Sequence, residues 1–126
     1  MKKEAIRTNN APSPIGAYSQ AIKCGNLVFV SGQIPIDPKT TELVSDKIND
    51  QIERVFTNVL EIIDEAGGTW QNIVKMTIYL KDLEHFDLVN EFMNNLFSKP
   101  FPARALIEVN DLPKQALIEV DAIMIL

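Results

Sequence analysis

The fold is decided by residues 73–109, which read IVKMTIYLKDLEHFDLVNEFMNNLFSKPFPARALIEV. The first nine residues alternate between apolar and polar side chains, with Val74 on the apolar side, and this pattern predicts a strand. Apolar residues then recur at helical spacing from Phe86 to Phe97, which predicts a helix with its Phe and Met stripe in the core. Two prolines lead into a second strand over 103–109. This order predicts parallel strands joined by a right-handed crossover.

The remaining elements extend this unit on both sides. They are an irregular segment over 8–16, strands over 17–24 and 27–32 joined by a hairpin, a helix from an N-cap at Asp46 to a glycine stop at 67–68, and a closing strand over 116–125. The order is β-β-α-β-α-β-β within a single domain, residues 1–126. We therefore predict an α+β fold in which both helices cover one face of a mixed sheet. The short loop before the closing strand predicts an antiparallel hairpin with the strand over 103–109.

The closing strand predicts an oligomer. Both of its faces are largely apolar, with Ile118, Val120, Ala122 and Met124 on one face and Leu117, Ile123 and Ile125 on the other. Glu119 and Asp121 interrupt the second face. Because the two helices cover only one side of the sheet, we expect the other side to meet a copy of itself in a homo-oligomer.

The composition limits the classes of partner. The 126 residues carry a net charge of −5 with scattered basic residues, which argues against nucleic acid or an anionic membrane surface as a partner. No segment approaches the roughly 18 apolar residues of a spanning helix, and we expect a cytoplasmic protein. Cys24 is the only cysteine and His85 the only histidine, so Ser-His-Asp, Cys-His and zinc sites are disfavoured.

Arg104 is the clearest candidate for a functional residue. It lies in the otherwise apolar stretch FPARALIEV, and burying a guanidinium without an anionic partner is costly. Alternation places Arg104, Leu106 and Glu108 on one face, which we expect to point away from the helices, toward the side that a partner subunit covers. Two interpretations stay open, an ion pair with Glu119 or Asp121 at a subunit contact and the capture of a small carboxylate ligand. Neutral hydrogen-bonding side chains at the ends of elements join this set: Tyr18, Ser31 and Asn90.

Five motifs in order carry a family resemblance: IGAYSQAI, LVFVSGQIP, VKMTIYLKDLEHFDLVN, FPARALIEV and LPKQALIEVDAI. Together they resemble the RidA family of reactive intermediate deaminases, formerly YjgF, over nearly the whole chain. The resemblance implies a fold like the Bacillus-type chorismate mutase, in which the four strands after the first are ordered 1-4-2-3. It also implies a homotrimer with the sheets facing inward and sites between subunits. The closing strand would then lie centrally in the sheet instead of forming the hairpin.

Family members hydrolyse 2-imino acids and their enamine tautomers, such as 2-aminoacrylate and 2-iminobutanoate, to 2-oxo acids and ammonia without a cofactor or metal. The resemblance implies that Arg104 binds the substrate carboxylate, Glu119 positions and deprotonates water, and the backbone carbonyl of Leu106 holds the substrate nitrogen. It assigns the rest of the pocket to Tyr18, Ser31, Gly32 and Asn90. Many relatives carry cysteine at the position of Leu106. This difference excludes a thiol role there and leaves deamination possible, because that role belongs to the backbone.

Other functions compete with this one. The main alternative is a non-catalytic regulatory protein that binds a small carboxylate through Arg104. The presence of Glu119 favours the enzyme, because a second negative charge would weaken the binding of a carboxylate. Chorismate mutase activity would require several cations around a dicarboxylate, and only Arg104 is evident. Ribonuclease activity or translation inhibition fits poorly with an acidic chain that lacks a histidine pair.

Overall fold

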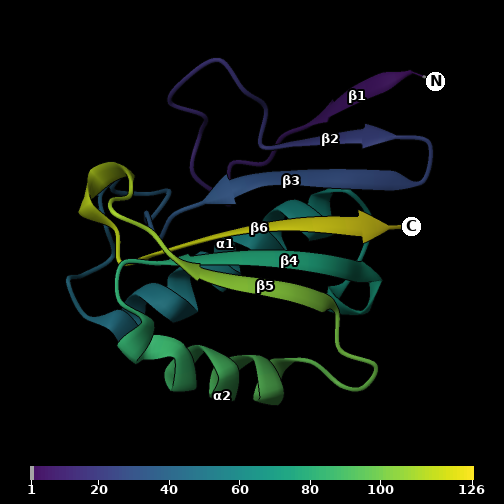
Figure 1. Ribbon diagram of the computed structural model, residues 1–126. Helices are drawn as coiled ribbons and strands as arrows, with labels where there is room; N and C mark the ends of the chain where they lie inside the picture. Colours follow the sequence, from purple (N-terminus) through teal and green to yellow (C-terminus); the bar gives the residue numbers. More distant parts are fainter. Residues whose placement is uncertain (1) are drawn as a thin grey trace.

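The computed structural model describes residues 2–126, in which six strands form one sheet and two α-helices pack on one side of it (Figure 1). The strands are β1 (Lys3–Ile6), β2 (Ala21–Cys24), β3 (Leu27–Gln33), β4 (Ile73–Leu80), β5 (Ala103–Glu108) and β6 (Ile118–Ile125). The helices are α1 (Ile48–Glu65) and α2 (Phe86–Leu96), with short 3-10 turns η1 (Trp70–Asn72), η2 (Leu83–His85) and η3 (Pro113–Gln115). The predicted α+β class is confirmed.

The strand order across the sheet is β1-β2-β3-β6-β4-β5, with β4 and β5 parallel and the other neighbours antiparallel. The order 1-4-2-3 implied by the family resemblance is therefore confirmed. The hairpin expected between 103–109 and 116–125 is wrong, because β6 pairs with β3 and β4 while β5 pairs with β4. The central position gives β6 a hydrogen-bonded neighbour along both edges, which an edge hairpin would not provide.

The ends of α1 are set by its flanking backbone. The expected N-cap at Asp46 is wrong, because Lys47 is the residue before the helix and no side chain caps it. The carboxylate of Asp46 thus lies one residue too early to act as the cap. The predicted glycine stop is confirmed: Gly67 has a φ of +92°, and the Gly68 N–H donates to the Ile63 carbonyl at 3.0 Å.

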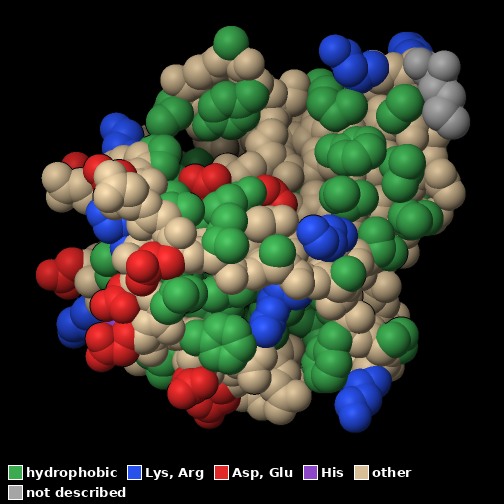
Figure 2. Space-filling view, viewed as in Figure 1, with side chains coloured by type: hydrophobic (Ala, Val, Ile, Leu, Met, Phe, Trp, Pro, Cys, Tyr) green, Lys and Arg blue, Asp and Glu red, His purple; other side chains and the backbone are tan. Residues whose placement is uncertain are grey.

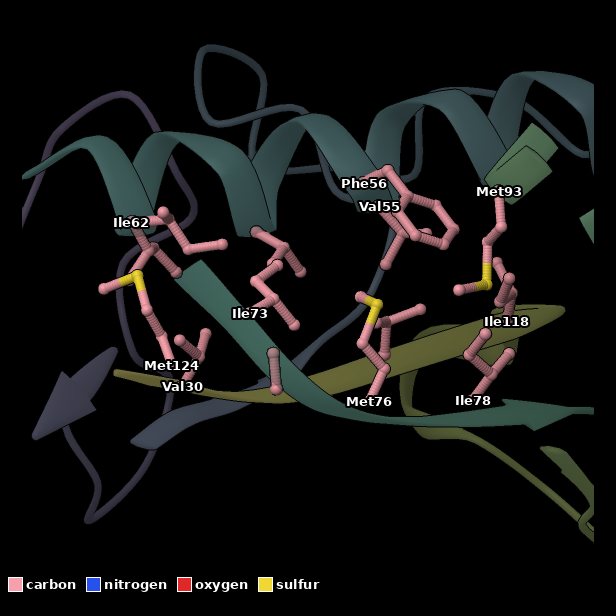
Figure 3. Close-up of a cluster of buried hydrophobic side chains, with 14 of the residues drawn as sticks. Val30, Val55, Phe56, Ile62, Ile73, Met76, Ile78, Met93, Ile118 and Met124 are labelled. Carbon is pink, nitrogen blue, oxygen red and sulfur yellow. The ribbon is translucent and has the colours of Figure 1, made fainter. Parts of the chain in front are cut away.

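The core lies between the sheet and the helices (Figure 3). Side chains from five elements meet there: Val30 of β3; Val55, Phe56 and Ile62 of α1; Ile73, Met76 and Ile78 of β4; Met93 of α2; and Ile118 and Met124 of β6. Two expectations for this core are wrong. Val74 is 42% exposed, because a register shift between Ile73 and Lys75 turns Ile73 inward in its place. Phe86 is 39% exposed and lies at the rim of α2.

The N-terminal segment contains a strand that the sequence pattern did not indicate. Lys3–Ile6 pair with β2 as the edge strand β1, whereas the strand expected over 17–24 begins only at Ala21. The residues between them form a loop that is held by the buried amide of Gln20. Its Oε1 accepts from the Thr8 N–H at 2.7 Å, and its Nε2 donates to the Pro12 carbonyl at 2.9 Å. Because the amide satisfies loop backbone groups on both sides, the loop is fixed against the sheet.

The face of the sheet opposite the helices is uncovered within the chain. Figure 2 shows hydrophobic side chains gathered over the strands on this side, and four of them are between 36% and 46% exposed: Leu27, Phe29, Ile107 and Ile125. We call this side the open face. The expectation that both helices leave one side of the sheet without cover is therefore confirmed for the single chain. No helix within residues 2–126 combines the length and the apolar character needed to cross a bilayer.

Candidate active site

Arg104 lies on the helix side of the sheet. It is paired with Met76 of β4, and Leu106 is paired with Ile78. Directly paired residues on neighbouring strands share a face, and Met76 and Ile78 are fully buried beneath the helices. The expectation that Arg104 and Leu106 point away from the helices is therefore wrong. Glu108 also lies toward the helical side, since its Oε1 accepts from the Leu83 N–H at 3.0 Å.

Three side chains of α2 contact the Arg104 guanidinium. Its Nη1 donates to Asn90 Oδ1 at 3.0 Å and lies 3.6 Å from Met93 Sδ. Its Cζ lies 5.4 Å from the centre of the Phe86 ring, within the range of a cation–π contact. Beside it opens a hollow of about 370 Å³, lined by Asn90, Met93, Asn94, Phe101, Pro102 and Arg104.

Arg104 forms no ion pair within residues 2–126. The ion pair in this part of the chain joins Lys81 to Asp111 at 3.1 Å. An ion pair of Arg104 with Glu119 or Asp121 is thus not formed inside one chain. The guanidinium is oriented by uncharged groups and keeps its positive charge available for an anion.

Leu106 presents its side chain to the protein and not to a ligand. It follows Arg104 by two residues on the same face of β5 and packs against the core. A ligand can therefore use only the backbone of this residue. That arrangement agrees with the backbone role that the family resemblance implies for Leu106.

Glu119 lies on the open face of β6. It is paired with Tyr79 of β4, and a bulge between Val30 and Gln33 brings Gly32 of β3 beside it. A Cβ added at Gly32 would overlap the Glu119 carboxylate. Glycine is therefore required at position 32 if the carboxylate is to keep its place, and bulges of this kind often lie next to active sites.

The surroundings of Glu119 alter its proton affinity. Burial raises the pKa of Glu119 above its ordinary value, and the negative charge of Asp121 raises it further. Tyr79 donates its hydroxyl hydrogen to Asp121 Oδ2 at 2.8 Å, and this hydrogen bond together with burial raises the pKa of Tyr79. The sequence did not single out Tyr79, although its place on the polar side of the alternating strand was a signal.

Ser31 and Tyr18 lie near Glu119 on the β3 side. The Ser31 hydroxyl donates to the Ser19 carbonyl at 2.6 Å, which ties the bulge to the loop that carries Tyr18. Tyr18 is 47% exposed, and its hydroxyl oxygen accepts from the Ile15 N–H at 3.3 Å. Tyr18 and Gly32 line a small hollow of about 30 Å³.

The candidate residues thus form two half-sites in one chain. The acid half-site contains Glu119, Gly32, Ser31 and Tyr18 on and beside the open face. The arginine half-site contains Arg104, Asn90 and Leu106 at the edge between β5 and α2. β4 separates β5 from β6, and neighbouring strands lie about 4.8 Å apart. Because the half-sites also face opposite sides of the sheet, one small ligand cannot contact Arg104 and Glu119 of the same chain.

Neither half-site has the donors of a metal centre. Within residues 2–126, no group of three His, Cys, Asp or Glu side chains is arranged to hold a metal ion. The arginine half-site offers N–H donors and an amide, which suit an organic anion. The acid half-site offers a carboxylate of raised pKa, which suits proton transfer.

Comparison with known proteins places the chain in one family. Residues 8–126 match the protein family described as Endoribonuclease L-PSP. A RutC family protein of Pyrococcus abyssi is 52% identical over 123 residues, which are 98% of this chain and 97% of that protein. A protein of Dermatophagoides farinae named 2-iminobutanoate/2-iminopropanoate deaminase is 38% identical over 124 residues, with 98% and 97% of the two chains covered.

A solved structure agrees with the sequence comparisons. The crystal structure of RidA from the Antarctic bacterium Psychrobacter sp. superimposes with a TM-score of 0.94 at 41% identity and covers 98% of this chain and 99% of that one. This TM-score shows that the two proteins share one fold over nearly their full lengths. The chain therefore belongs to the RidA family, also known as YjgF or RutC.

Proposed function

We propose that this protein hydrolyses reactive 2-imino acids and their enamine tautomers, such as 2-iminobutanoate and 2-aminoacrylate, to 2-oxo acids and ammonia. The observation that carries the proposal is the state of Arg104. Its guanidinium is oriented by α2 yet pairs with no carboxylate within residues 2–126, so it is available to a substrate carboxylate. The relative from Dermatophagoides farinae, which bears the name of this activity, supports the assignment.

The proposed chemistry requires little beyond orientation. Arg104 grips the substrate carboxylate, and the Leu106 carbonyl accepts a hydrogen bond from the protonated imine nitrogen. Glu119 takes a proton from water as the water oxygen attacks the imine carbon, and the C–N double bond becomes a single bond. The same proton is then returned to nitrogen. As the C–N bond breaks, the hydroxyl oxygen becomes the carbonyl oxygen and Glu119 takes the hydroxyl proton, so a 2-oxo acid and ammonia leave and the proton passes to solvent. Each such proton transfer contributes on the order of 10² to 10⁴ in rate.

The raised pKa of Glu119 suits this role. A carboxylate that holds its proton more tightly is a stronger base once it is ionised, so it removes a proton from water more readily. A protein that only bound carboxylates would gain nothing from a second carboxylate in the pocket, because like charges repel. The acid half-site therefore favours the enzyme over the non-catalytic alternative.

The proposal includes a homotrimer with its sheets inside. A partner that packs against the open face would cover its exposed apolar side chains and bring its own arginine half-site to Glu119. Each active site would then combine Arg104 of one subunit with Glu119 of another. Ribonuclease activity, the activity in the family's description, receives less support, since the chain has a net charge of −5 and one histidine.

The test generates the substrate in the cuvette, because imines hydrolyse spontaneously. A threonine or serine dehydratase supplies 2-iminobutanoate or 2-aminoacrylate, and release of the 2-oxo acid is followed with and without this protein. Wild type should accelerate the release, and Arg104→Ala should return it to the spontaneous rate. A wild type that binds 2-oxobutanoate by calorimetry but leaves the spontaneous rate unchanged would establish the regulatory alternative.

A further inference from the structure

Three residues at helical spacing on α2 surround the guanidinium of Arg104. Phe86, Asn90 and Met93 stand four and three residues apart, which places them on one stripe of the helix. Of these, the family resemblance assigns a place in the pocket only to Asn90. We infer that Phe86 is a positioning residue, whose ring holds the Arg104 guanidinium in place so that one edge of it receives the carboxylate. The inference rests on the proposed function for the identity of that carboxylate.

The burial of Phe86 argues against a purely structural role. Phe86 is 39% exposed, whereas Val89 and Met93 on the same helix are at most 4% exposed and fill the core. The described ring pairs of the chain join Phe56, Trp70, Phe92 and Phe97 and do not include Phe86. Its ring instead contacts the Arg104 guanidinium. The face of the ring carries negative charge density, which attracts this cation.

The hydrogen bonds of Arg104 define which edge stays available. Nη1 contacts Asn90 Oδ1 at 3.0 Å and Met93 Sδ at 3.6 Å, so both of its hydrogens have partners. Nε and Nη2 donate to no residue within 2–126. Their N–H groups lie side by side along one edge of the planar fork, the arrangement that binds a carboxylate through two parallel hydrogen bonds.

The ring and the amide fix different motions of the guanidinium. Asn90 holds one end of the fork, whereas the ring of Phe86, whose centre lies 5.4 Å from Cζ, attracts the centre of the guanidinium and opposes its movement away from α2. Ordering a flexible side chain before the ligand arrives lowers the cost of binding. An aliphatic residue at position 86 would keep the apolar contact and lose the attraction of the ring. We expect this loss to weaken carboxylate binding roughly three- to tenfold.

The experiment measures the affinity for 2-oxobutanoate by calorimetry. Phe86→Leu should raise the Kd about three- to tenfold, and Phe86→Tyr, which keeps the ring, should stay close to wild type. The KM for the imine should rise by the same factor in Phe86→Leu while kcat changes less than about twofold, since the ring does not touch the reacting atoms. Leu83→Ala is the matched control, because Leu83 is 46% exposed beside the start of α2, whereas the side chains that contact the Arg104 guanidinium are Phe86, Asn90 and Met93.

A second measurement separates the ring's charge distribution from its shape. Phenylalanines with increasing fluorine substitution, placed at position 86 by site-specific incorporation, weaken the negative ring face while nearly preserving its size. The Kd should rise in step with fluorination at constant thermal stability. Equal affinity across this series, or an equal loss in Phe86→Tyr and Phe86→Leu, would overturn the inference.

The outcomes distinguish the inference from the proposed function. If wild type binds 2-oxobutanoate without accelerating imine hydrolysis, the proposed function fails and the Kd series still decides the role of Phe86. If wild type deaminates while Phe86→Leu binds and turns over normally, the inference alone fails. If wild type does not bind 2-oxobutanoate at all, Arg104 is not a carboxylate clamp and the role assigned to Phe86 falls with it.

Discussion

Arg104 and Glu119 lie on opposite faces of one sheet, on strands that are separated by β4. Each residue has its own neighbours within the chain: Arg104 donates a hydrogen bond to Asn90, and the Glu119 carboxylate lies against Gly32. A catalyst that needs both residues must therefore take them from different copies of the chain.

Two inactive variants should restore activity to one another. Arg104→Ala and Glu119→Gln should each reduce the enzyme-catalysed rate to near zero alone. In the proposed trimer, refolded from an equal mixture of the two variants, a site is intact where an Arg104→Ala subunit donates Glu119 and a Glu119→Gln subunit donates Arg104. Random assembly makes about a quarter of the sites intact, so about a quarter of wild-type activity should return.

The control for this complementation is the mixture without unfolding. Separately folded variants that are combined and assayed at once should stay inactive, because subunits have not exchanged. Persistent inactivity of the refolded mixture, with trimers verified by light scattering, would show that the two residues do not share a site across an interface.

Gly32→Ala should disable the enzyme more than it destabilises the fold. A Cβ at position 32 would overlap the Glu119 carboxylate and displace it, and a displacement of about 1 Å in a catalytic group can cost about 10² in rate. We expect kcat/KM to fall at least about 100-fold while circular dichroism and affinity for 2-oxobutanoate change little.

Gly16→Ala is the matched control for Gly32→Ala. A Cβ at position 16 would meet Tyr18 ring atoms at 3.6 Å, an ordinary contact. Its activity should stay within about twofold of wild type. Comparable losses in both alanine variants would mean that the space in front of Glu119 is not what matters.

The pH dependence of catalysis should reveal the effect of the Asp121 charge on the pKa of Glu119. Burial raises the pKa of Glu119, and the charge of Asp121 raises it further. Because the base works only when it is ionised, activity should fall on the acid side at a higher pH than it would with a carboxyl group of ordinary pKa. Asp121→Asn removes the neighbouring charge, and the acid limb of kcat/KM should move to lower pH. Rates are corrected for spontaneous hydrolysis at each pH. Asp111→Asn, which removes an exposed carboxylate paired with Lys81, should leave the limb in place.

The same raised pKa predicts a stability effect with a definite sign. The Glu119 carboxyl group holds its proton more tightly in the folded state than in the unfolded state, where its pKa lies near 4.5. Its contribution to folding is therefore complete below that pH and is lost as the pH rises through the folded pKa. Glu119→Gln should show a Tm advantage over wild type that appears as the pH is raised from about 4 to about 7. A constant or shrinking advantage would contradict the raised pKa.

The sequence patterns predicted the helices and strands that have a clear periodicity, but they did not predict features that depend on contacts between distant parts of the chain. Helical spacing identified α2, and alternation identified β4 and β5, because these periods reflect burial of one face. The edge strand β1 was missed because its four residues, KEAI, carry no alternation that distinguishes them from a loop. The central place of β6 came from the family resemblance and not from the pattern, since a short loop by itself predicts a hairpin.

The side of the sheet on which Arg104 lies could not be predicted from the sequence. Alternation correctly grouped Arg104 with Leu106, but it cannot say which group faces the helices. Ala103 and Ala105, on the other side of β5, pair with Lys75 and Thr77 and face the open side. Because β5 is an edge strand beside α2, the long side chain of an arginine can lie on the helix side of the sheet and still place its charged end at the surface. Phe86 was assigned to the core for the same reason, because its partner is a residue distant in sequence.

Leu106→Cys should separate the backbone role of this position from its side-chain role. The Leu106 side chain packs against the core, while the proposed contact to the substrate nitrogen uses the carbonyl oxygen. Replacing leucine with the smaller cysteine should lower the free energy of unfolding by about 1 kcal/mol through lost packing. The kcat/KM for imine hydrolysis should stay within about threefold of wild type, because the carbonyl is retained. The variant is also treated with iodoacetamide, which alkylates thiols. The wild type, treated in the same way, controls for alkylation of Cys24. A much higher rate in the variant that alkylation abolishes would mean that a thiol at position 106 takes part in catalysis.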